Sequence, residues 1–308
     1  MSKAAEIEVT RPAPGVARFT VPLAMPAPDH LHVHVLETSD GPVLVDTGAR
    51  GSESALAAGL KALGQVPERV LITHGHIDHW GLAATLAPSV LAHPGVAPSL
   101  AFAGGDRDGS PGGGWPDAAA MERAFAGFSA LVAGVPGIDP LEDGQMVGDW
   151  RVLWTPGHDP GHVCLFREGD GVLLCGDLLL PGFTPNIQPA WDGADALGDF
   201  LGSLRRVAEL PVRCVLPAHG DPYMDARRRA DELAAHHAKR LDQLRMELAP
   251  APMTLARLRD AVFSVDVRDS ANAMLALMET QAHLEHLHRR GEAYPGPGAT
   301  WVLAGGGR

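Results

Sequence analysis

Hydrophobic residues in the first 224 positions fall into short runs that predict strands and helices in alternation. Residues 31–37 and 42–46 predict a hairpin, because Ser39 to Pro42 between them favour a tight turn. A helix is predicted over 52–63, with Ser52 as its candidate N-cap. The same patterns predict strands at 69–73, 150–155, 162–167, 171–175 and 212–216, and helices at 118–133 and 194–210. Short connections between strands and helices indicate a layered architecture of sheets and helices.

The pattern changes after Tyr223. A long helix is predicted over 225–249, followed by shorter helices that begin at Thr254 and Ser270 and by two last strands around 295–298. Helix, helix and hairpin in this order are typical of a winged helix, so we expect two domains, 1–224 and 225–308. The long helix has a coiled-coil-like 3-4-3-4 seam that either packs on the first domain or forms a homodimer: Ala234, His237, Leu241, Leu244 and Leu248.

Charge separates the same two parts of the 308-residue chain. Residues 1–224 hold 13 Lys and Arg against 26 Asp and Glu, a net of −13, whereas residues 225–308 hold 12 against 11, a net of +1. An acidic first part disfavours nucleic acid and anionic membranes as partners. Three cysteines without a Cys-x-x-Cys pair, together with the lack of a signal-like or membrane-spanning apolar run, favour a cytoplasmic protein.

The segment Thr73 to His79 carries the strongest chemical signal, because it places three imidazoles and one carboxylate directly after a buried strand. Neutral imidazole and carboxylate are ligands that suit zinc and similar cations. His74 and His76 can point one way while Asp78 and His79 point another, which indicates two neighbouring ions. The remaining ligands are expected at the ends of later strands, next to glycine: His158, Asp177 and His219.

This set of residues resembles the metallo-β-lactamase superfamily over roughly residues 15–224. The resemblance implies an αββα sandwich with one ion held by His74, His76 and His158 and a second held by Asp78, His79 and His219. It also implies that Asp177 bridges the ions and that Asp46 orients a ligand imidazole. We expect His162 to support the loop that bears His158. Antibiotic-hydrolysing members commonly carry Cys where this chain has Asp177, which disfavours β-lactam hydrolysis.

A narrower resemblance extends over nearly the whole chain. Residues 155–162, residues 176–187 and the C-terminal helices resemble a subgroup with a β-lactamase-associated winged helix. This subgroup includes glyoxalase-II-like hydrolases, acyl-carrier-protein thioesterases and a mitochondrial endoribonuclease. The scaffold therefore serves several substrates, and the resemblance alone does not select one.

Several residues near the predicted ligands are candidates for a substrate pocket. Aromatic and apolar side chains could form the wall of a site for an acyl chain, or could simply seal the core: Trp80, Phe183, Ile187 and Trp191, with Trp115, Met121, Phe125 and Phe128. His32 and His34 lie on one face of a predicted strand and either border the site or bond to neighbouring strands. His283 and His286 are three residues apart on a predicted helix, where we expect them to be surface residues.

The sequence therefore predicts a hydrolase with two divalent metal ions that cleaves a small acyl substrate. A thioester is the first choice and an ester or lactone the next, with a hydroxide shared by the two ions as nucleophile and Asp78 handling a proton. Zinc is the default metal, although carboxylate-bridged sites accept iron or manganese. One alternative is an RNA phosphodiesterase that docks RNA on the winged helix. Another is a binding module without catalytic activity that retains the metals for structure.

Overall fold

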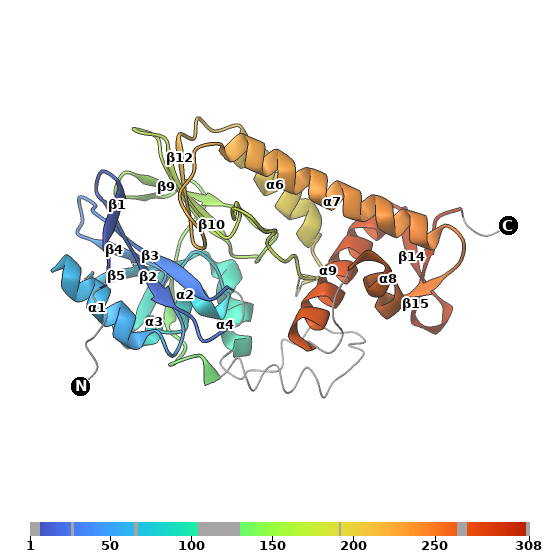
Figure 1. The fold of residues 1–308 in the computed structure, drawn as a ribbon, viewed down its shortest axis with the longest axis horizontal. Helices are drawn as coiled ribbons and strands as arrows, with labels where there is room; N and C mark the ends of the chain where they lie inside the picture. Colours follow the sequence, from blue (N-terminus) through green and yellow to red (C-terminus); the bar gives the residue numbers. More distant parts are fainter. Residues whose placement is uncertain are drawn as a thin grey trace.

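A computed structural model gives the fold of the chain and describes residues 7–25, 28–64, 67–103, 130–190, 192–263 and 270–305. Two β-sheets lie face to face, with helices on both outer sides, and further helices with a small third sheet extend from one end (Figure 1). This arrangement confirms the αββα sandwich expected from the sequence.

The first sheet contains seven strands among the described residues, and neighbours in the sheet follow chain order. They are β1 (Thr10–Ala13), β2 (Val16–Pro22), β3 (His30–Leu36), β4 (Val43–Val45), β5 (Arg69–Leu71), β6 (Ser89–Ala92) and β7 (Gly137–Pro140). The pairs from β1 to β4 are antiparallel and those from β4 to β7 are parallel. The carboxyl ends of β4 and β5 therefore meet at one edge, and β3 with β4 confirms the predicted hairpin.

The second sheet has the order β12-β11-β10-β9-β8. Its strands are β8 (Met146–Val147), β9 (Trp150–Trp154), β10 (Val163–Arg167), β11 (Val172–Gly176) and β12 (Cys214–Pro217). β11 and β12 are parallel, while β10 is antiparallel to both β9 and β11. The ends of β9, β11 and β12 and the start of β10 consequently lie at a common edge of the sheet.

Within the described part of the chain, three groups of buried apolar residues hold these layers together. Between the sheets pack residues such as Leu36, Trp150 and Leu165. The opposite face of β3, including Leu31 and Val33, packs under the helices that cover the first sheet. Those helices are α1 (Glu53–Leu63), α2 (Ile77–Trp80), α3 (Ala83–Leu86) and α4 (Ala97–Ala103), with the 3-10 turn η1 (Pro94–Val96).

The outer face of the second sheet shares its core with the C-terminal helices. The elements on that side are α6 (Ala196–Ala208), α7 (Ala226–Leu248), α8 (Leu255–Val262), α9 (Ser270–Arg289), β13 (Met253–Thr254), β14 (Ala293–Gly296), η2 (Pro297–Ala299) and β15 (Thr300–Leu303). β13, β15 and β14 form the small third sheet. The predicted order of helix, helix and hairpin is present, whereas the winged-helix assignment and the boundary at residue 224 stay predictions.

The seam on α7 packs inside this chain. His237, Leu241, Leu244 and Leu248 are buried, and the three leucines belong to the core shared with α6, α8 and α9. The seam is therefore covered within this chain, by α6 of the predicted first domain and by α8 and α9 of the predicted second one. A homodimer stays a prediction and would need a different surface.

Capping groups explain where several helices begin. The side chains of Asp225 and Thr254 accept backbone N–H groups at the starts of α7 and α8. Ser52 precedes α1 as predicted, but its hydroxyl donates to the carbonyl of Pro22 at 2.6 Å and does not cap the helix. The predicted helix over 118–133 lies mostly outside the described residues.

Candidate metal centre

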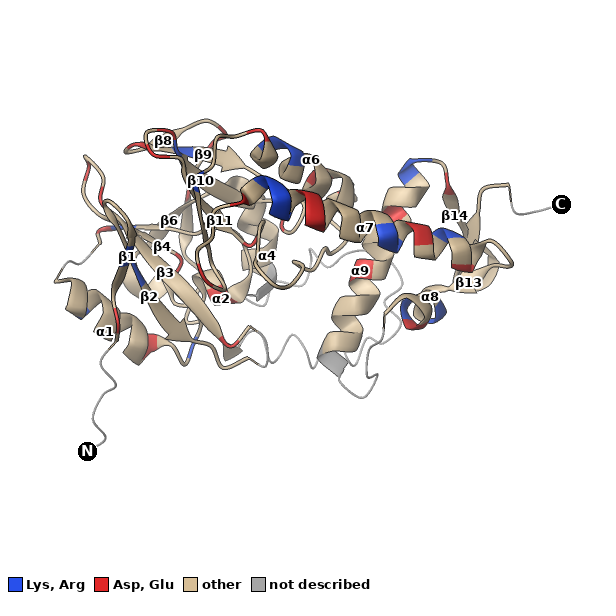
Figure 2. Ribbon diagram, turned by 45° about the horizontal axis from the view of Figure 1, so that its top comes forward, with Lys and Arg blue, Asp and Glu red and all other residues tan. Residues whose placement is uncertain are grey.

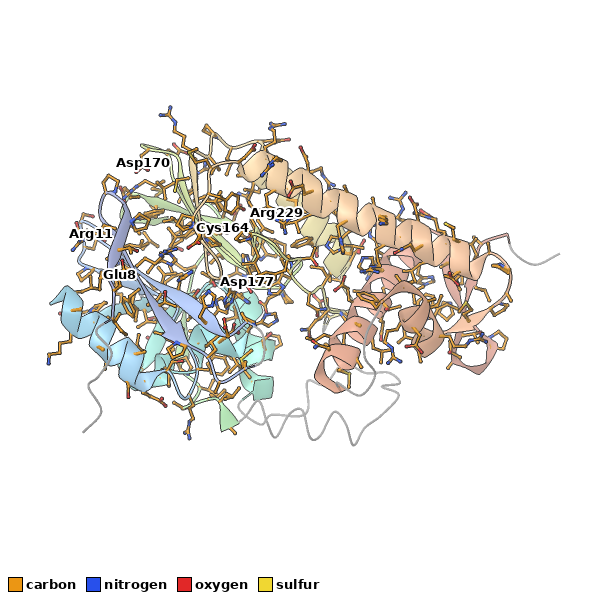
Figure 3. The ribbon with its side chains drawn as sticks, in the orientation of Figure 1. Glu8, Arg11, Cys164, Asp170, Asp177 and Arg229 are labelled. Carbon is orange, nitrogen blue, oxygen red and sulfur yellow. The ribbon has the colours of Figure 1, made fainter. Side chains whose placement is uncertain are left out.

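The predicted ligands converge at the common edge of the two sheets. His74 and His76 lie between β5 and α2, and Asp78 and His79 lie in α2. His158 lies between β9 and β10, while Asp177 and His219 follow β11 and β12. The N–H of Val163 donates to the carbonyl of Thr73 at 2.8 Å and so joins the two sheets at this edge. Figure 3 shows Asp177 near the middle of the molecule, between the sandwich and the C-terminal helices.

The ligand atoms form three overlapping groups, in each of which all atoms lie within 4.8 Å of one another. The groups are His74, His76 and His158; His74, His79 and Asp177; and Asp78, His79 and His219. The seven side chains thus divide into the two sets that the family resemblance implies, and Asp177 lies where the sets meet.

The carboxylate of Asp177 faces both sets. Its Oδ1 lies 3.6 Å from His79 Nε2 and 3.5 Å from His219 Nε2, while its Oδ2 lies 3.7 Å from His158 Nε2. Asp78 Oδ2 lies 3.3 Å from His219 Nε2. Zinc–ligand bonds of about 2.0–2.2 Å in a tetrahedron place the ligand atoms about 3.3–3.6 Å apart. The observed separations therefore suit cations placed between these atoms.

Hydrogen bonds on the far side of three of the imidazoles leave Nε2 of each directed into the centre. His79 Nδ1 donates to Asp46 Oδ2 at 2.8 Å, and His219 Nδ1 donates to the carbonyl of His30 at 2.6 Å. His158 Nδ1 donates to the carbonyl of Asn186 at 2.8 Å. Such partners fix the tautomer and the ring orientation of a metal-binding histidine.

Asp46 is held in an unusual backbone conformation. Its φ is +62°, in the left-handed region that non-glycine residues seldom adopt. In this position Asp46 Oδ1 accepts the backbone N–H of Thr73 at 2.8 Å, while Asp46 Oδ2 accepts from His79. The strained residue therefore connects the end of β4 to the loop that carries the first two ligands, which gives the strain a structural purpose.

His162 supports the centre through a backbone contact. Its Nε2 accepts the N–H of Asp177 at 3.1 Å, so its proton is on Nδ1 and is donated to Thr155 Oγ1 at 2.8 Å. Gly176 makes this approach possible, since a Cβ there would lie 2.6 Å from His162 Nε2. His162 thus positions the Asp177 carboxylate, as well as lying at the end of the loop that bears His158.

The charges of the centre favour a cation. Burial lowers the pKa of His76 to about 3, which keeps that imidazole neutral. Burial alone would raise the pKa of Asp78, but His79 and His219 lower it to about 2. Burial likewise opposes protonation of His79, yet the Asp46 and Asp78 carboxylates raise its pKa well above its usual value. The negative charge of these carboxylates favours a positive charge in the buried centre. A bound divalent ion can supply that charge in place of a proton on the imidazole.

Unpaired polar atoms provide an independent test of whether these residues fit a metal. Among the described residues, buried atoms without a hydrogen-bond partner include Nε2 of His74, His79, His158 and His219 and Oδ1 of Asp177. Buried polar atoms in folded proteins are nearly always paired. All five atoms point into one centre, and bonds to divalent metal ions would satisfy them together.

The motif at residues 73–79 did not reveal every residue that shapes the centre. Asp159 is buried, and it accepts from Ser99 Oγ at 2.9 Å and from the backbone N–H of Gly161 at 2.8 Å. A Cβ at Gly75 would lie 2.9 Å from Asp159 Oδ2, and 2.5 Å from the Cβ of Ser99 in α4. The loop that carries His74 and His76 is therefore closely packed against the loop that carries His158. In the sequence, the pointer to this contact was the position of Asp159 directly after His158.

Two of the predicted pocket residues belong to the core instead. Trp80 is 0% exposed, donates its indole N–H to the carbonyl of Gly75 at 2.8 Å and packs under the first sheet. Ile187 is also fully buried, in the core beside the second sheet. Phe183 is 46% exposed and stays a candidate. The remaining predicted aromatic and apolar residues lie outside the described residues: Trp191, Trp115, Met121, Phe125 and Phe128.

His32 and His34 lie on the face of β3 that points between the sheets, and both are buried. Thr20 Oγ1 lies 3.0 Å from His32 Nδ1. Burial lowers the pKa of His32 to about 4 and that of His34 to about 3. Both are neutral and packed within the sandwich, so the structure does not place them against a substrate. His283 and His286 are buried as well, contrary to the expected surface position.

Comparisons with known proteins agree with this geometry. The family model described as "Metallo-beta-lactamase superfamily" matches residues 27–219. The chain is 30% identical to "Probable metallo-hydrolase YqjP" of Bacillus subtilis (strain 168), over 82% of this chain and 86% of that protein. It is also 30% identical to "Hydroxyacylglutathione hydrolase" of Anaeromyxobacter dehalogenans (strain 2CP-C), over 73% and 77%. A crystal structure of the family protein TTHA1429 from Thermus thermophilus superposes with a TM-score of 0.81 at 31% identity, over 94% and 99%.

Proposed function

The chain belongs to the metallo-β-lactamase superfamily, and from this we propose that it is a hydrolase with two divalent metal ions that cleaves a small acyl thioester. The observation that carries the proposal is the position of Asp177, whose two oxygens face different sets of imidazoles. An ester or a lactone is the next candidate substrate.

Three features support an acyl substrate. The chain resembles a hydroxyacylglutathione hydrolase over 73% of its length, and Asp177 stands where antibiotic-hydrolysing members commonly carry Cys. Residues 1–224 carry a net charge of −13, which opposes binding of a polyanion such as RNA. Figure 2 shows charges of both signs along α7, where RNA docking would need a basic surface.

The residues of the chain have separate roles in this mechanism. His74, His76 and His158 would hold one ion, Asp78, His79 and His219 the other, and Asp177 would bridge them. When bound, the ions would supply Lewis acidity for the substrate carbonyl and a water of lowered pKa. The ionised side chain of Asp78 would accept a proton during attack. Asp46 and His162 hold His79 and Asp177 in place. Zinc is the metal we propose first, since imidazole and carboxylate ligands suit it.

The proposed location is the cytoplasm, because all three cysteines are unpaired. Among the described helices, none combines the length and the apolar character needed to cross a membrane.

The test is a hydrolysis panel on purified protein whose metal content is quantified. The panel contains acyl thioesters, lactones, β-lactams and single-stranded RNA, each assayed with Asp177→Ala as control. Thioester cleavage that depends on Asp177 is expected. Cleavage of RNA with a steep loss of binding at higher salt would replace the proposal with the phosphodiesterase. Two bound ions without cleavage of any substrate in the panel would favour a binding module.

A further inference from the structure

Asn186 connects the metal ligand His158 to the C-terminal helix α9. Its backbone carbonyl accepts the Nδ1–H of His158 at 2.8 Å. Its side-chain amide donates to the carbonyl of Leu275 at 3.1 Å and to Glu279 Oε2 at 3.0 Å. The carbonyl that fixes the ring of His158 is therefore itself held by two groups of α9, which lie about ninety residues further along the chain.

We propose that Glu279 is a positioning residue for the metal centre, acting through Asn186 on His158. The inference rests on the proposed metal centre and is independent of which substrate is cleaved. It gives the C-terminal helices a role in holding the ligand geometry of the sandwich.

The position of Glu279 suits this role. The residue is 5% exposed, and its hydrogen bond to Asn186 is partly buried. A glutamate side chain keeps an oxygen that can accept the amide in either of its protonation states. Loss of the side chain would leave the Asn186 amide with the Leu275 carbonyl as its one partner on α9, so that the loop from Asp177 to Ile187 could move relative to His158.

The backbone at Glu279 is also connected to α7, because a histidine of α9 forms a hydrogen bond with a histidine of α7. The carbonyl of Glu279 accepts the Nδ1–H of His283 at 2.7 Å, so His283 Nε2 carries a lone pair. That atom accepts the Nδ1–H of His237 on α7 at 3.1 Å, and both imidazoles are fully buried. The contacts thus run from α7 through α9 and Asn186 to the ligand His158.

The same three residues, His237, Glu279 and His283, also have ligand atoms within 4.8 Å of one another. Two observations favour hydrogen bonding over a third metal ion. The facing nitrogens of the two imidazoles already pair, and the guanidinium of Arg240 is close enough for its charge to act on both Glu279 and His283. A divalent ion would add positive charge beside an existing cation.

The test measures metal binding in the full chain without any substrate. Zn²⁺ affinity is determined by competition with a chromophoric chelator for Glu279→Ala, Glu279→Gln, Asn186→Ala and the double alanine variant. Glu285→Ala is the matched control, since Glu285 lies on the same helix and bonds to Gln281 at 2.9 Å. Thermal melting and metal content are recorded for each protein.

We expect each single alanine variant to bind Zn²⁺ up to about tenfold more weakly. This is the lower end of the loss seen when a ligating histidine loses its partner, because here the carbonyl of residue 186 remains but is held less firmly. The double variant should match the single ones, as two residues acting through one contact are not additive. Glu279→Gln, which retains an acceptor oxygen, should recover affinity to within about threefold of the wild-type protein. Glu285→Ala should bind normally.

The role of Glu279 would be overturned by normal affinity in Asn186→Ala, by additive losses in the double variant, or by an equal loss in Glu285→Ala. It would also be overturned by a third bound ion that Glu279→Gln removes. If Glu279→Ala does not fold, Asn186→Ala still decides, because it leaves the carbonyl that His158 uses. A chain that binds two ions but cleaves no thioester would refute the proposed substrate and leave this role intact.

Discussion

Replacing Asp46 by Asn tests how the second metal set is held. The Asp46 carboxylate accepts from His79 Nδ1 and from the backbone N–H of Thr73, each at 2.8 Å. Its φ of +62° is a conformation that Asn tolerates better than most residues. Asp46→Asn therefore keeps the shape of the side chain and of the backbone while removing the negative charge.

The size of the effect follows from the tautomer of His79. If the amide oxygen of the introduced side chain keeps the bond to Thr73, its NH₂ group faces His79 Nδ1 and cannot accept a proton from it. The imidazole then carries its proton on Nε2, the atom that faces Asp78 and Asp177. Loss of such a partner weakens metal binding about 10–100-fold. This corresponds to about 1.4–2.8 kcal/mol, close to the worth of a hydrogen bond to a charged group.

The assay is chelator competition at neutral pH, with metal content measured after dialysis. Asp242→Asn is the control, because Asp242 is exposed and contacts only Arg245 among the ion pairs of the described residues. Zn²⁺ affinity of Asp46→Asn within about twofold of the wild-type value would refute the tautomer argument. A melting temperature that falls equally in metal-free protein would show that the change acts on the fold and not on the ligand.

Four further outcomes are expected. Asp177→Ala should retain at most one ion per chain, measured by metal analysis, because both sets lose an oxygen ligand. Chelation should lower the melting temperature by roughly 5–10 °C, since saturating metal adds about 4 kcal/mol at a thousandfold excess over Kd. Burial raises the pKa of Glu279 to about 7, so its protonated form stabilises the fold fully below about pH 4.5 and this contribution disappears as the pH rises through 7. Urea unfolding should therefore show Glu279→Gln gaining roughly 3 kcal/mol over the wild-type protein between pH 4.5 and 8. Leu244→Ala should cost about 2–5 kcal/mol in urea unfolding without changing metal content, because Leu244 is fully buried and distant in the chain from the ligands.

Local patterns predicted a layered arrangement of sheets and helices and the candidate metal ligands, while the αββα sandwich came from the family resemblance. Each ligand follows an apolar run that must be a strand, and the ends of neighbouring strands meet at one edge of a sheet. Asp46 was implied by the resemblance alone, and the structure shows that it follows the strand that pairs in parallel with the one before His74. The predicted ligands therefore lie close together in the fold because each lies near the end of a strand.

The pocket residues were predicted from their nearness to the ligands in the sequence. Nearness in sequence does not determine the direction in which a side chain points, so this prediction failed for Trp80 and Ile187. Trp80 follows His79 directly, yet in a helix consecutive side chains point about 100° apart, so the ligand faces the centre and the indole faces the core. Ile187 also turns inward next to Asn186, although this segment is not helical. Backbone acceptors such as the carbonyls of His30 and Asn186 leave no sequence signal, because every residue has one.

The histidines of α7 and α9 show how the C-terminal helices are connected to the sandwich. An imidazole in an otherwise apolar seam costs free energy unless it is paired, and His237 finds its partner in His283, forty-six residues later. Neither spacing nor hydrophobic periodicity relates these positions, so only the folded chain reveals the pair. Because α9 bonds to Asn186, and Asn186 bonds to His158, His237 lies on the same chain of contacts as this predicted metal ligand. The core shared by the second sheet, α6, α7, α8 and α9 makes that chain of contacts part of one packed unit.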